Sequence, residues 1–149
     1  MLNKRYWLYV AAAIFSLSFS QVWASETQVS TDTPEDAINH YITAVKTGSG
    51  LHFRIAFKDT AAIQYFDRED QYKQFTRDAF AEYVNTGNQW GAQIEITELK
   101  TTGKVANATV EFTWGEQGQF GYVDYLNLID DGSGWKISDK VAQFIRRSK

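Results

Sequence analysis

The first part of the chain has hydrophobic positions spaced as in a helix. Apolar residues recur three and four positions apart within the segment 34–47, at Ile38, Tyr41, Ile42 and Val45. Thr33 suits the N-cap of this helix, and Pro34 suits its first position. The run Gly48-Ser49-Gly50 predicts its end. The sequence therefore predicts an amphipathic helix over residues 34–47.

The next forty residues alternate between short apolar runs and charged segments. The pattern predicts, in order, a helix over Leu51–Phe57, a strand over Ala62–Phe66, a charged loop over Asp67–Gln74 and a third helix over Arg77–Asn85. Thr76 suits the N-cap of the third helix, and Gly87 lies just beyond its end. No repeat or low-complexity tract interrupts this order.

From Trp90 onward the apolar positions follow the two-residue period of strands. Ile94 and Ile96 alternate with polar residues, and the run Val105–Trp114 is rich in β-branched and aromatic residues on one face. Two further strands, Phe120–Ile129 and Trp135–Val141, flank an Asp- and Gly-rich turn that indicates a hairpin. The pattern predicts an α+β fold in which a curved antiparallel sheet packs three helices on its concave face around a cone-shaped cavity. The other face of the sheet is left free for a partner subunit.

One carboxylate lies within the most apolar of these strands. Asp124 is flanked by Val123 and Tyr125. Burying a carboxylate is costly unless it is paired, protonated or used by the protein, so Asp124 is a candidate functional residue or a structurally paired one. Asp139 is a second candidate, because simple alternation places it on the face of Trp135 and Ile137. A strand-end acid that reaches solvent is the preferred interpretation for Asp139.

The N-terminus has the features of a targeting segment. Lys4 and Arg5 precede the apolar run Trp7–Phe19, and Val22-Trp23-Ala24 provides a cleavage site. The run is short for a membrane span, so we expect a signal peptide over residues 1–24 and export to a periplasm or to the medium, with no stable membrane insertion after cleavage. An uncleaved anchor is the less favoured alternative. Residues 25–33 are then a flexible leader, 34–145 the domain and 146–149 a basic tail.

Charge and composition exclude several classes of function. Of the 15 Lys and Arg residues, Lys4 and Arg5 belong to the targeting segment, which leaves 13 against 18 acidic residues, a formal net charge of −5. An acidic domain without a basic cluster argues against binding to nucleic acid or anionic membranes. There is no cysteine, and we expect the two histidines, His40 and His52, to be a solvated residue and a capping or surface residue. We expect neither a metal site nor a cofactor.

Four segments together resemble a known superfamily: Tyr41–Gly48, Ala56–Ala61, Val123–Leu126 and Gly134–Ile137. In their order and spacing the chain resembles the nuclear transport factor 2-like superfamily. It is most similar to the exported bacterial branch described as putative lumazine-binding proteins. The resemblance covers Pro34–Phe144 and implies the cone-shaped, cystatin-like fold. Ser49 stands where the family usually has Asp, a local turn or capping position.

The resemblance also implies a site. In ketosteroid isomerase-like members, a tyrosine and a protonated aspartate donate hydrogen bonds to an oxyanion, and these match Tyr41 and Asp124. The general base of those enzymes falls near Tyr65, where this chain has no carboxylate. Asp67, two residues further on and expected on the same strand face, is the nearest substitute. We therefore predict ligand-binding residues Tyr41, Tyr65, Asp67 and Asp124, although Tyr41 also suits a core position.

The missing base favours a binding protein over an enzyme. We expect a small apolar or aromatic ligand, such as a pteridine of the lumazine type, and a homodimer formed through the exposed sheet face. One alternative is a cofactor-free isomerase or dehydratase that uses Asp67 as its base, which requires Asp67 to point into the cavity. The other is a protein-interaction module whose cavity is filled by its own side chains.

Overall fold

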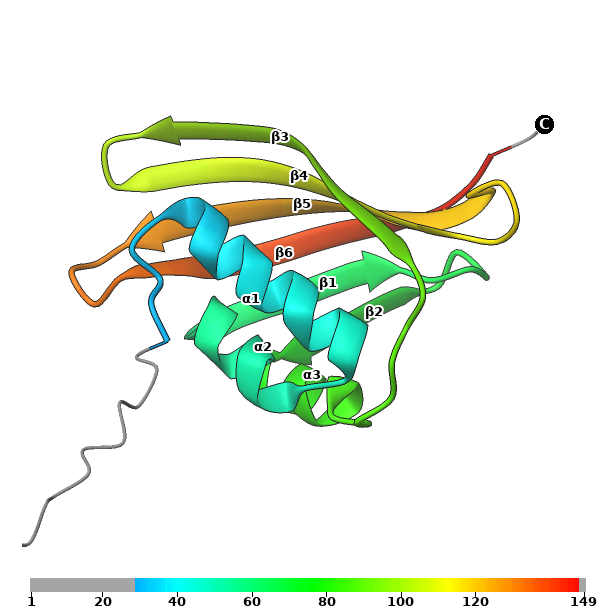
Figure 1. The fold of residues 1–149 in the computed structure, drawn as a ribbon, viewed down its shortest axis with the longest axis horizontal. Helices are drawn as coiled ribbons and strands as arrows, with labels where there is room; N and C mark the ends of the chain where they lie inside the picture. The colour runs from blue at the N-terminus through cyan, green and yellow to red at the C-terminus, as the bar shows by residue number, and fades with distance from the viewer. Residues whose placement is uncertain (1–28, 148–149) are drawn as a thin grey trace, which may run out of the picture.

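The computed structural model describes residues 29–147, which form three helices and six strands (Figure 1). The elements are α1 (Pro34–Thr47), α2 (Gly50–Ala56), β1 (Phe57–Phe66), β2 (Tyr72–Thr76), α3 (Arg77–Val84), β3 (Gln93–Thr102), β4 (Val105–Trp114), β5 (Phe120–Asp130) and β6 (Trp135–Arg146). The predicted signal peptide, the leader residues 25–28 and the tail residues 148–149 lie outside this range. Within residues 29–147, no helix has the length and apolar character needed to cross a membrane.

Helix α1 begins and ends at the residues that the sequence indicates. The Thr33 hydroxyl accepts a hydrogen bond from the Asp36 amide, and the Asp36 carboxylate accepts one from the Thr33 amide, which completes a capping box. Gly48 ends the helix in the left-handed conformation, with φ of 64°. The face that contains Ile38 and Tyr41 is buried. The predicted first helix is confirmed.

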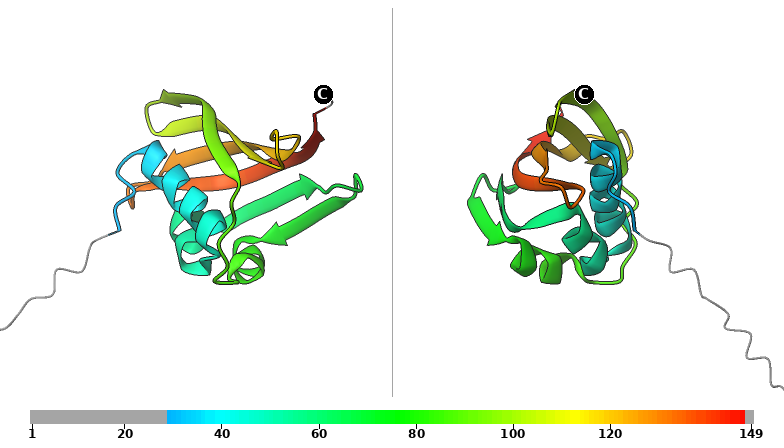
Figure 2. Two further views of the ribbon diagram at one scale, coloured as in Figure 1. Left: turned by 45° about the vertical axis from the view of Figure 1, so that its right-hand side comes forward. Right: turned by 90° about the vertical axis from the view of Figure 1, so that its left-hand side faces the viewer.

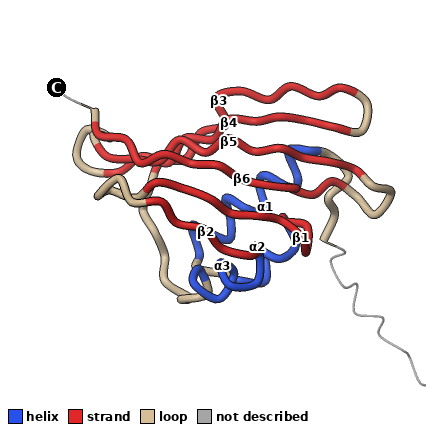
Figure 3. Tube along the Cα trace, turned by 180° about the vertical axis from the view of Figure 1, so that it is seen from behind, coloured by secondary structure: helices blue, strands red, loops and turns tan. Residues whose placement is uncertain are grey.

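The strands form one curved, open sheet in the order β2-β1-β6-β5-β4-β3. All three helices lie on its concave side (Figure 2). Seen from behind, the strands follow one another from β3 at one edge to β2 at the other, with the helices beyond them (Figure 3). Strands β3 to β6 form the predicted antiparallel meander. The α+β cone fold is confirmed.

Two features of the sheet differ from the prediction. The sheet is mixed, because β1 pairs in parallel with β6. In addition, residues 72–74 belong to strand β2 rather than to a charged loop, and β2 forms a hairpin with β1. The turn between the strands is held by Asp67, whose carboxylate accepts hydrogen bonds from the amides of Glu69 and Gln71. Because the charged turn residues are followed directly by the short strand β2, the sequence pattern shows no clear start of this strand.

The segment before α1 is attached to the sheet. Thr31 is buried, and its carbonyl oxygen accepts a hydrogen bond of 2.7 Å from the Trp135 amide at the start of β6. The segment also approaches Gly134 so closely that a Cβ at that position would lie 2.5 Å from the Thr31 hydroxyl oxygen. The packed part of the chain therefore includes Thr31, which lies within the predicted flexible leader.

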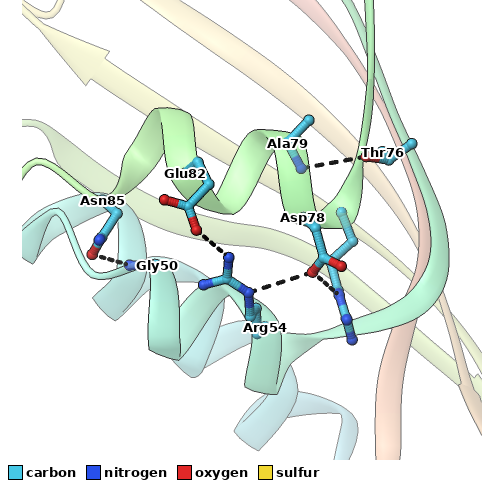
Figure 4. A network of polar contacts seen from close by, with 8 residues as sticks. Gly50, Arg54, Thr76, Asp78, Ala79, Glu82 and Asn85 are labelled. Atoms are coloured by element: carbon cyan, nitrogen blue, oxygen red, sulfur yellow. Dashed lines mark hydrogen bonds and ion pairs between the residues drawn. The ribbon is translucent and has the colours of Figure 1, made fainter.

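Helices α2 and α3 are joined by polar contacts that fix the position of α3 (Figure 4). The Gly50 amide donates to the Asn85 side-chain oxygen over 3.1 Å, and Arg54 forms ion pairs with Asp78 and Glu82. Thr76 caps α3 by accepting a hydrogen bond from the Ala79 amide. Exposed ion pairs each contribute little to stability, but together these contacts orient a helix of eight residues.

Candidate functional site

A cavity of about 550 Å³ lies between the helices and the concave face of the sheet. Its wall contains seven aromatic residues, Tyr41, Tyr65, Phe80, Tyr83, Trp90, Phe112 and Tyr122. Its mouth is polar and exposed, at Thr86, Asn88 and Gln89 of the connection between α3 and β3. A cavity of this size and lining is typical of a small-molecule site.

The buried end of the cavity contains three polar side chains, Tyr41 on α1, Asp124 on β5 and Lys140 on β6, which we call the buried triad. The Tyr41 hydroxyl donates to Asp124 Oδ2 over 2.5 Å. Lys140 Nζ lies 2.7 Å from that same oxygen and 2.7 Å from the Tyr41 hydroxyl oxygen. Tyr41 and Asp124 are 2% and 0% exposed, and Lys140 is 6% exposed. The triad is therefore a desolvated ion pair bridged by a phenol.

The lysine determines the chemical character of the triad. A buried carboxylate beside an ammonium group is stabilised in its ionised form, in which it accepts hydrogen bonds and donates none. Burial, followed by the charge of Asp124 and the hydrogen bond to it, raises the pKa of Tyr41 well above its usual value. Tyr41 is thus a neutral phenol whose single proton is directed at Asp124. The arrangement differs from a pair of neutral donors directed at an oxyanion.

Sequence reasoning missed Lys140 because of a bulge in β6. The pairing of β5 with β6 shifts between Asn127 and Leu128, where Ser138 is the extra residue of the bulge. The Ser138 hydroxyl donates to the Asn127 carbonyl oxygen, which stabilises this geometry. Beyond Ser138 the alternation of faces is inverted, so Lys140 points into the cavity.

The same bulge removes Asp139 from the cavity face. Instead of sharing the face of Trp135 and Ile137, Asp139 pairs with Asn127 and accepts hydrogen bonds from the Asn127 amide group. Asp139 does not line the cavity. The placement of Asp139 on the cavity face by simple alternation was therefore wrong. The polar pair Ser138-Asp139 within an apolar strand was a weak sign of the bulge.

Asp67 is not part of the cavity wall. Strand β1 ends at Phe66, so Asp67 does not continue the face of Tyr65, and that prediction was wrong. Its carboxylate holds the β1–β2 turn and lies 3.4 Å from Lys73 Nζ. The hydrogen bond from the Gln71 backbone, helped by Glu69 and Lys73, lowers the pKa of Asp67. The enzyme alternative required an inward-pointing base, and Asp67 does not meet that requirement.

Tyr65, which the resemblance places near the general base of ketosteroid isomerase-like members, does line the cavity and belongs to an aromatic cluster. Its ring meets the Tyr122 ring edge to face at 5.9 Å between centroids. Burial, helped by the neighbouring Tyr83 and Asp67, raises the pKa of Tyr65. Burial, with smaller contributions from Tyr65 and Asp67, raises the pKa of Tyr122 to about 12. Both phenols therefore remain neutral at ordinary pH and present hydroxyl groups beside the cavity.

The mouth connection is held against the end of α1. The Gly87 amide donates to the Gly48 carbonyl oxygen, and the Trp90 amide donates to the Lys46 carbonyl oxygen, each over 2.9 Å. Gly48 lies so close to this connection that a Cβ would come within 2.8 Å of the Asn88 backbone nitrogen. The end of α1 therefore positions the residues at the cavity mouth.

Comparison with known proteins identifies the family. The family model described as "Putative lumazine-binding" matches residues 30–143. The chain belongs to this family. No curated protein sequence matches the chain.

Solved structures confirm the fold of this family member as nuclear transport factor 2-like. An NTF2-like protein of unknown function from Shewanella baltica OS155 has a TM-score of 0.65 and 16% identity, covering 76% of this chain and 92% of that one. Another from Methylobacillus flagellatus KT has a TM-score of 0.63 and 23% identity, covering 78% and 98%. A ketosteroid isomerase-like protein from Erwinia carotovora atroseptica SCRI1043 has a TM-score of 0.57 and 16% identity, covering 82% and 99%. At these identities the likeness concerns the fold alone.

The two histidines of this lumazine-binding family member lie together outside the cavity. His40 on α1 and His52 on α2 are stacked, with 2.8 Å between their Nδ1 atoms. One Nδ1 must donate and the other must accept, so at most one of the two rings is a positively charged imidazolium in this contact. The expectation that His40 is a solvated residue was wrong. Within residues 29–147, no group of three or more potential ligands (His, Cys, Asp or Glu) is placed to hold a metal ion.

Proposed function

We propose that this domain binds a small, neutral, aromatic molecule in its cavity. The observation that carries the proposal is the combination of an aromatic wall with a buried triad in which one ammonium and one carboxylate balance each other. A charged ligand would be repelled by the member of the pair that carries the same charge, whereas a neutral ring would be repelled by neither. Ring contacts with aromatic side chains add about 0.5–1.5 kcal/mol each beyond simple burial.

The size of the cavity supports a ligand over a self-filled core. An interaction module with its cavity filled by its own side chains predicts space for a few waters, and the cavity of about 550 Å³ contradicts that forecast. Sites for drug-sized ligands commonly measure about 300–1,000 Å³. A molecule of two or three fused rings is the size we infer, and a lumazine-type pteridine falls in that range.

The proposed cellular context follows from the sequence. The charged and apolar pattern of residues 1–24 supports export to a periplasm or to the medium, where the domain would act as a carrier or sensor of its ligand. The outer face of the sheet supports a homodimer, since Tyr125 and Val141 are 54% and 46% exposed there.

The test of binding combines two measurements. Native mass spectrometry of the mature protein purified from its host would reveal a co-purified small molecule. Thermal-shift titration with lumazine and other neutral fused-ring compounds should raise the melting temperature, by an amount that grows with ligand concentration. The absence of both an adduct and a shift across the panel would reject the proposal.

A matched pair of tyrosine variants locates the binding. Tyr83 and Tyr72 are both exposed, at 65% and 52%, but only Tyr83 lines the cavity. We expect Tyr83→Ala to weaken ligand binding about 3- to 10-fold, the value of one aromatic contact, and Tyr72→Ala to leave it unchanged. Equal effects of the two substitutions would place the ligand elsewhere.

A further inference from the structure

One oxygen of the buried triad has no partner. Asp124 Oδ2 accepts from Tyr41 and from Lys140, whereas Oδ1 accepts from nothing. Among the described residues, it is the one buried side-chain nitrogen or oxygen atom without a hydrogen bond. Such an atom destabilises the fold, and more so when it carries charge. An unsatisfied carboxylate oxygen beside a cavity is therefore a group that a ligand could satisfy.

Counting the remaining hydrogen-bonding capacity of the triad defines what the ligand must offer. Lys140 has three N–H donors, of which two are directed at Tyr41 and Asp124. The hydroxyl proton of Tyr41 is used on Asp124. What remains is one acceptor, Asp124 Oδ1, and one donor, the third N–H of Lys140. The buried end of the cavity thus presents an acceptor next to a donor.

Charge excludes the simpler ligands. An ammonium ligand would satisfy Asp124 but would be repelled by Lys140. A carboxylate ligand would satisfy Lys140 but would be repelled by Asp124. A ketone would use Lys140 alone and would leave Oδ1 unsatisfied. A neutral group with adjacent donor and acceptor atoms satisfies both without adding charge.

We propose that the ligand binds through the edge of a ring lactam or imide, –NH–C(=O)–, with its N–H donating to Asp124 Oδ1 and its carbonyl oxygen accepting from Lys140 Nζ. This inference rests on the proposed binding function and specifies the chemistry of its ligand. Lys140 keeps a small exposed surface, whereas Asp124 has none, so the carbonyl contact forms at an accessible group and the N–H contact requires a small shift of the side chains around Asp124. The aromatic wall then encloses the remainder of the conjugated ring system.

The experiment compares two ligands that share one ring system and differ in whether its two lactam nitrogens carry hydrogen or methyl. Lumazine carries two ring N–H groups next to carbonyls, and 1,3-dimethyllumazine keeps the ring and the carbonyls but has no N–H. Isothermal titration calorimetry at a pH where both are neutral should show lumazine binding at least 10-fold more tightly, because the dimethyl compound leaves Oδ1 unsatisfied. Equal affinities, or tighter binding of the dimethyl compound, would overturn the inference while the binding function stood.

A second arm uses other ligands and a variant. Tighter binding of an acceptor-only aryl ketone, 2-acetonaphthone, than of lumazine would also overturn the inference. If none of these rings binds and native mass spectrometry finds no co-purified molecule, the proposed function itself fails. In Asp124→Asn, the amide oxygen would face Lys140 and the NH2 group would face the ligand. The variant should therefore bind lumazine and 1,3-dimethyllumazine with about equal affinity. Should this variant not fold, the wild-type comparison decides alone.

Discussion

Replacing Lys140 by methionine removes the positive partner of a fully buried carboxylate. Methionine keeps the length and most of the volume of the side chain, so the packing against Phe80 and Tyr41 is largely retained. What changes is the charge: Asp124 is 0% exposed, and Lys140 Nζ at 2.7 Å is its cationic partner. The variant therefore isolates the ion pair from the packing of the aromatic wall.

The expected cost is large for a single substitution. Removing one partner of a buried ion pair typically destabilises a protein by about 3–5 kcal/mol, because the other charge is left uncompensated. The remaining hydrogen bond from Tyr41 is one charge-assisted contact of about 1.5–3 kcal/mol and does not replace the ammonium. Since small domains are stable by about 5–15 kcal/mol, a loss of about 3–5 kcal/mol in Lys140→Met removes at least about a fifth of the stability of the fold.

Urea denaturation followed by tryptophan fluorescence measures this cost. The matched control is Lys73→Met, because Lys73 forms an ion pair with Asp67 at 3.4 Å on the surface of the β1–β2 turn. That pair should contribute less than about 1 kcal/mol. The double variant Asp124→Asn/Lys140→Met should recover part of the loss, since it removes both charges and leaves a neutral amide bonded to Tyr41.

A stabilising ion pair between Lys140 and Asp124 requires the two lysine variants to differ in their free energies of unfolding. If Lys140→Met costs no more than Lys73→Met, Asp124 is not stabilised by Lys140 as an ionised group. Purely additive effects in the double variant would lead to the same conclusion, because two groups in direct contact at 2.7 Å should show a coupling energy.

Two further predictions concern the end of α1 and the histidine pair. Gly48→Ala should destabilise the domain by about 1–3 kcal/mol more than Gly103→Ala in urea denaturation: both positions have positive φ, but a Cβ at Gly48 meets the Asn88 backbone nitrogen at 2.8 Å and one at Gly103 meets nothing within 4 Å. Equal losses in the free energy of unfolding would show that the connection between α3 and β3 can shift to make room for a Cβ at position 48. Burial, followed by the charge of His52, lowers the pKa of His40 below its usual 6.5, so the unfolded chain binds more protons and the free energy of unfolding should fall as the pH is lowered from 7 to 5. The dependence should be weaker in His40→Gln, and an unchanged slope would assign it to other groups.

Much of the fold could be predicted from the sequence because its signals are local. The capping box at Thr33, the glycine at position 48 and the spacing of apolar residues determine α1 without help from the rest of the chain. The meander of β3 to β6 follows from two-residue alternation and short turns. Asp124 was found as a candidate because a carboxylate in an apolar pattern is visible in the sequence, whereas Tyr41 was found through the resemblance to ketosteroid isomerase-like proteins.

Contacts between distant segments decided the rest. A one-residue bulge at Ser138 inverts the faces of β6, so that Lys140 rather than Asp139 enters the cavity. The polar pair Ser138-Asp139 is only a weak local sign of this bulge, because the bulge is a property of the pairing with β5. Likewise, the parallel pairing of β1 with β6 joins strands that lie far apart in the chain. The sequence alone determined the fold and two of the three residues of the buried triad, Tyr41 and Asp124. Only tertiary pairing brought Lys140 to Asp124, because the direction of the Lys140 side chain depends on strand register rather than on residue type.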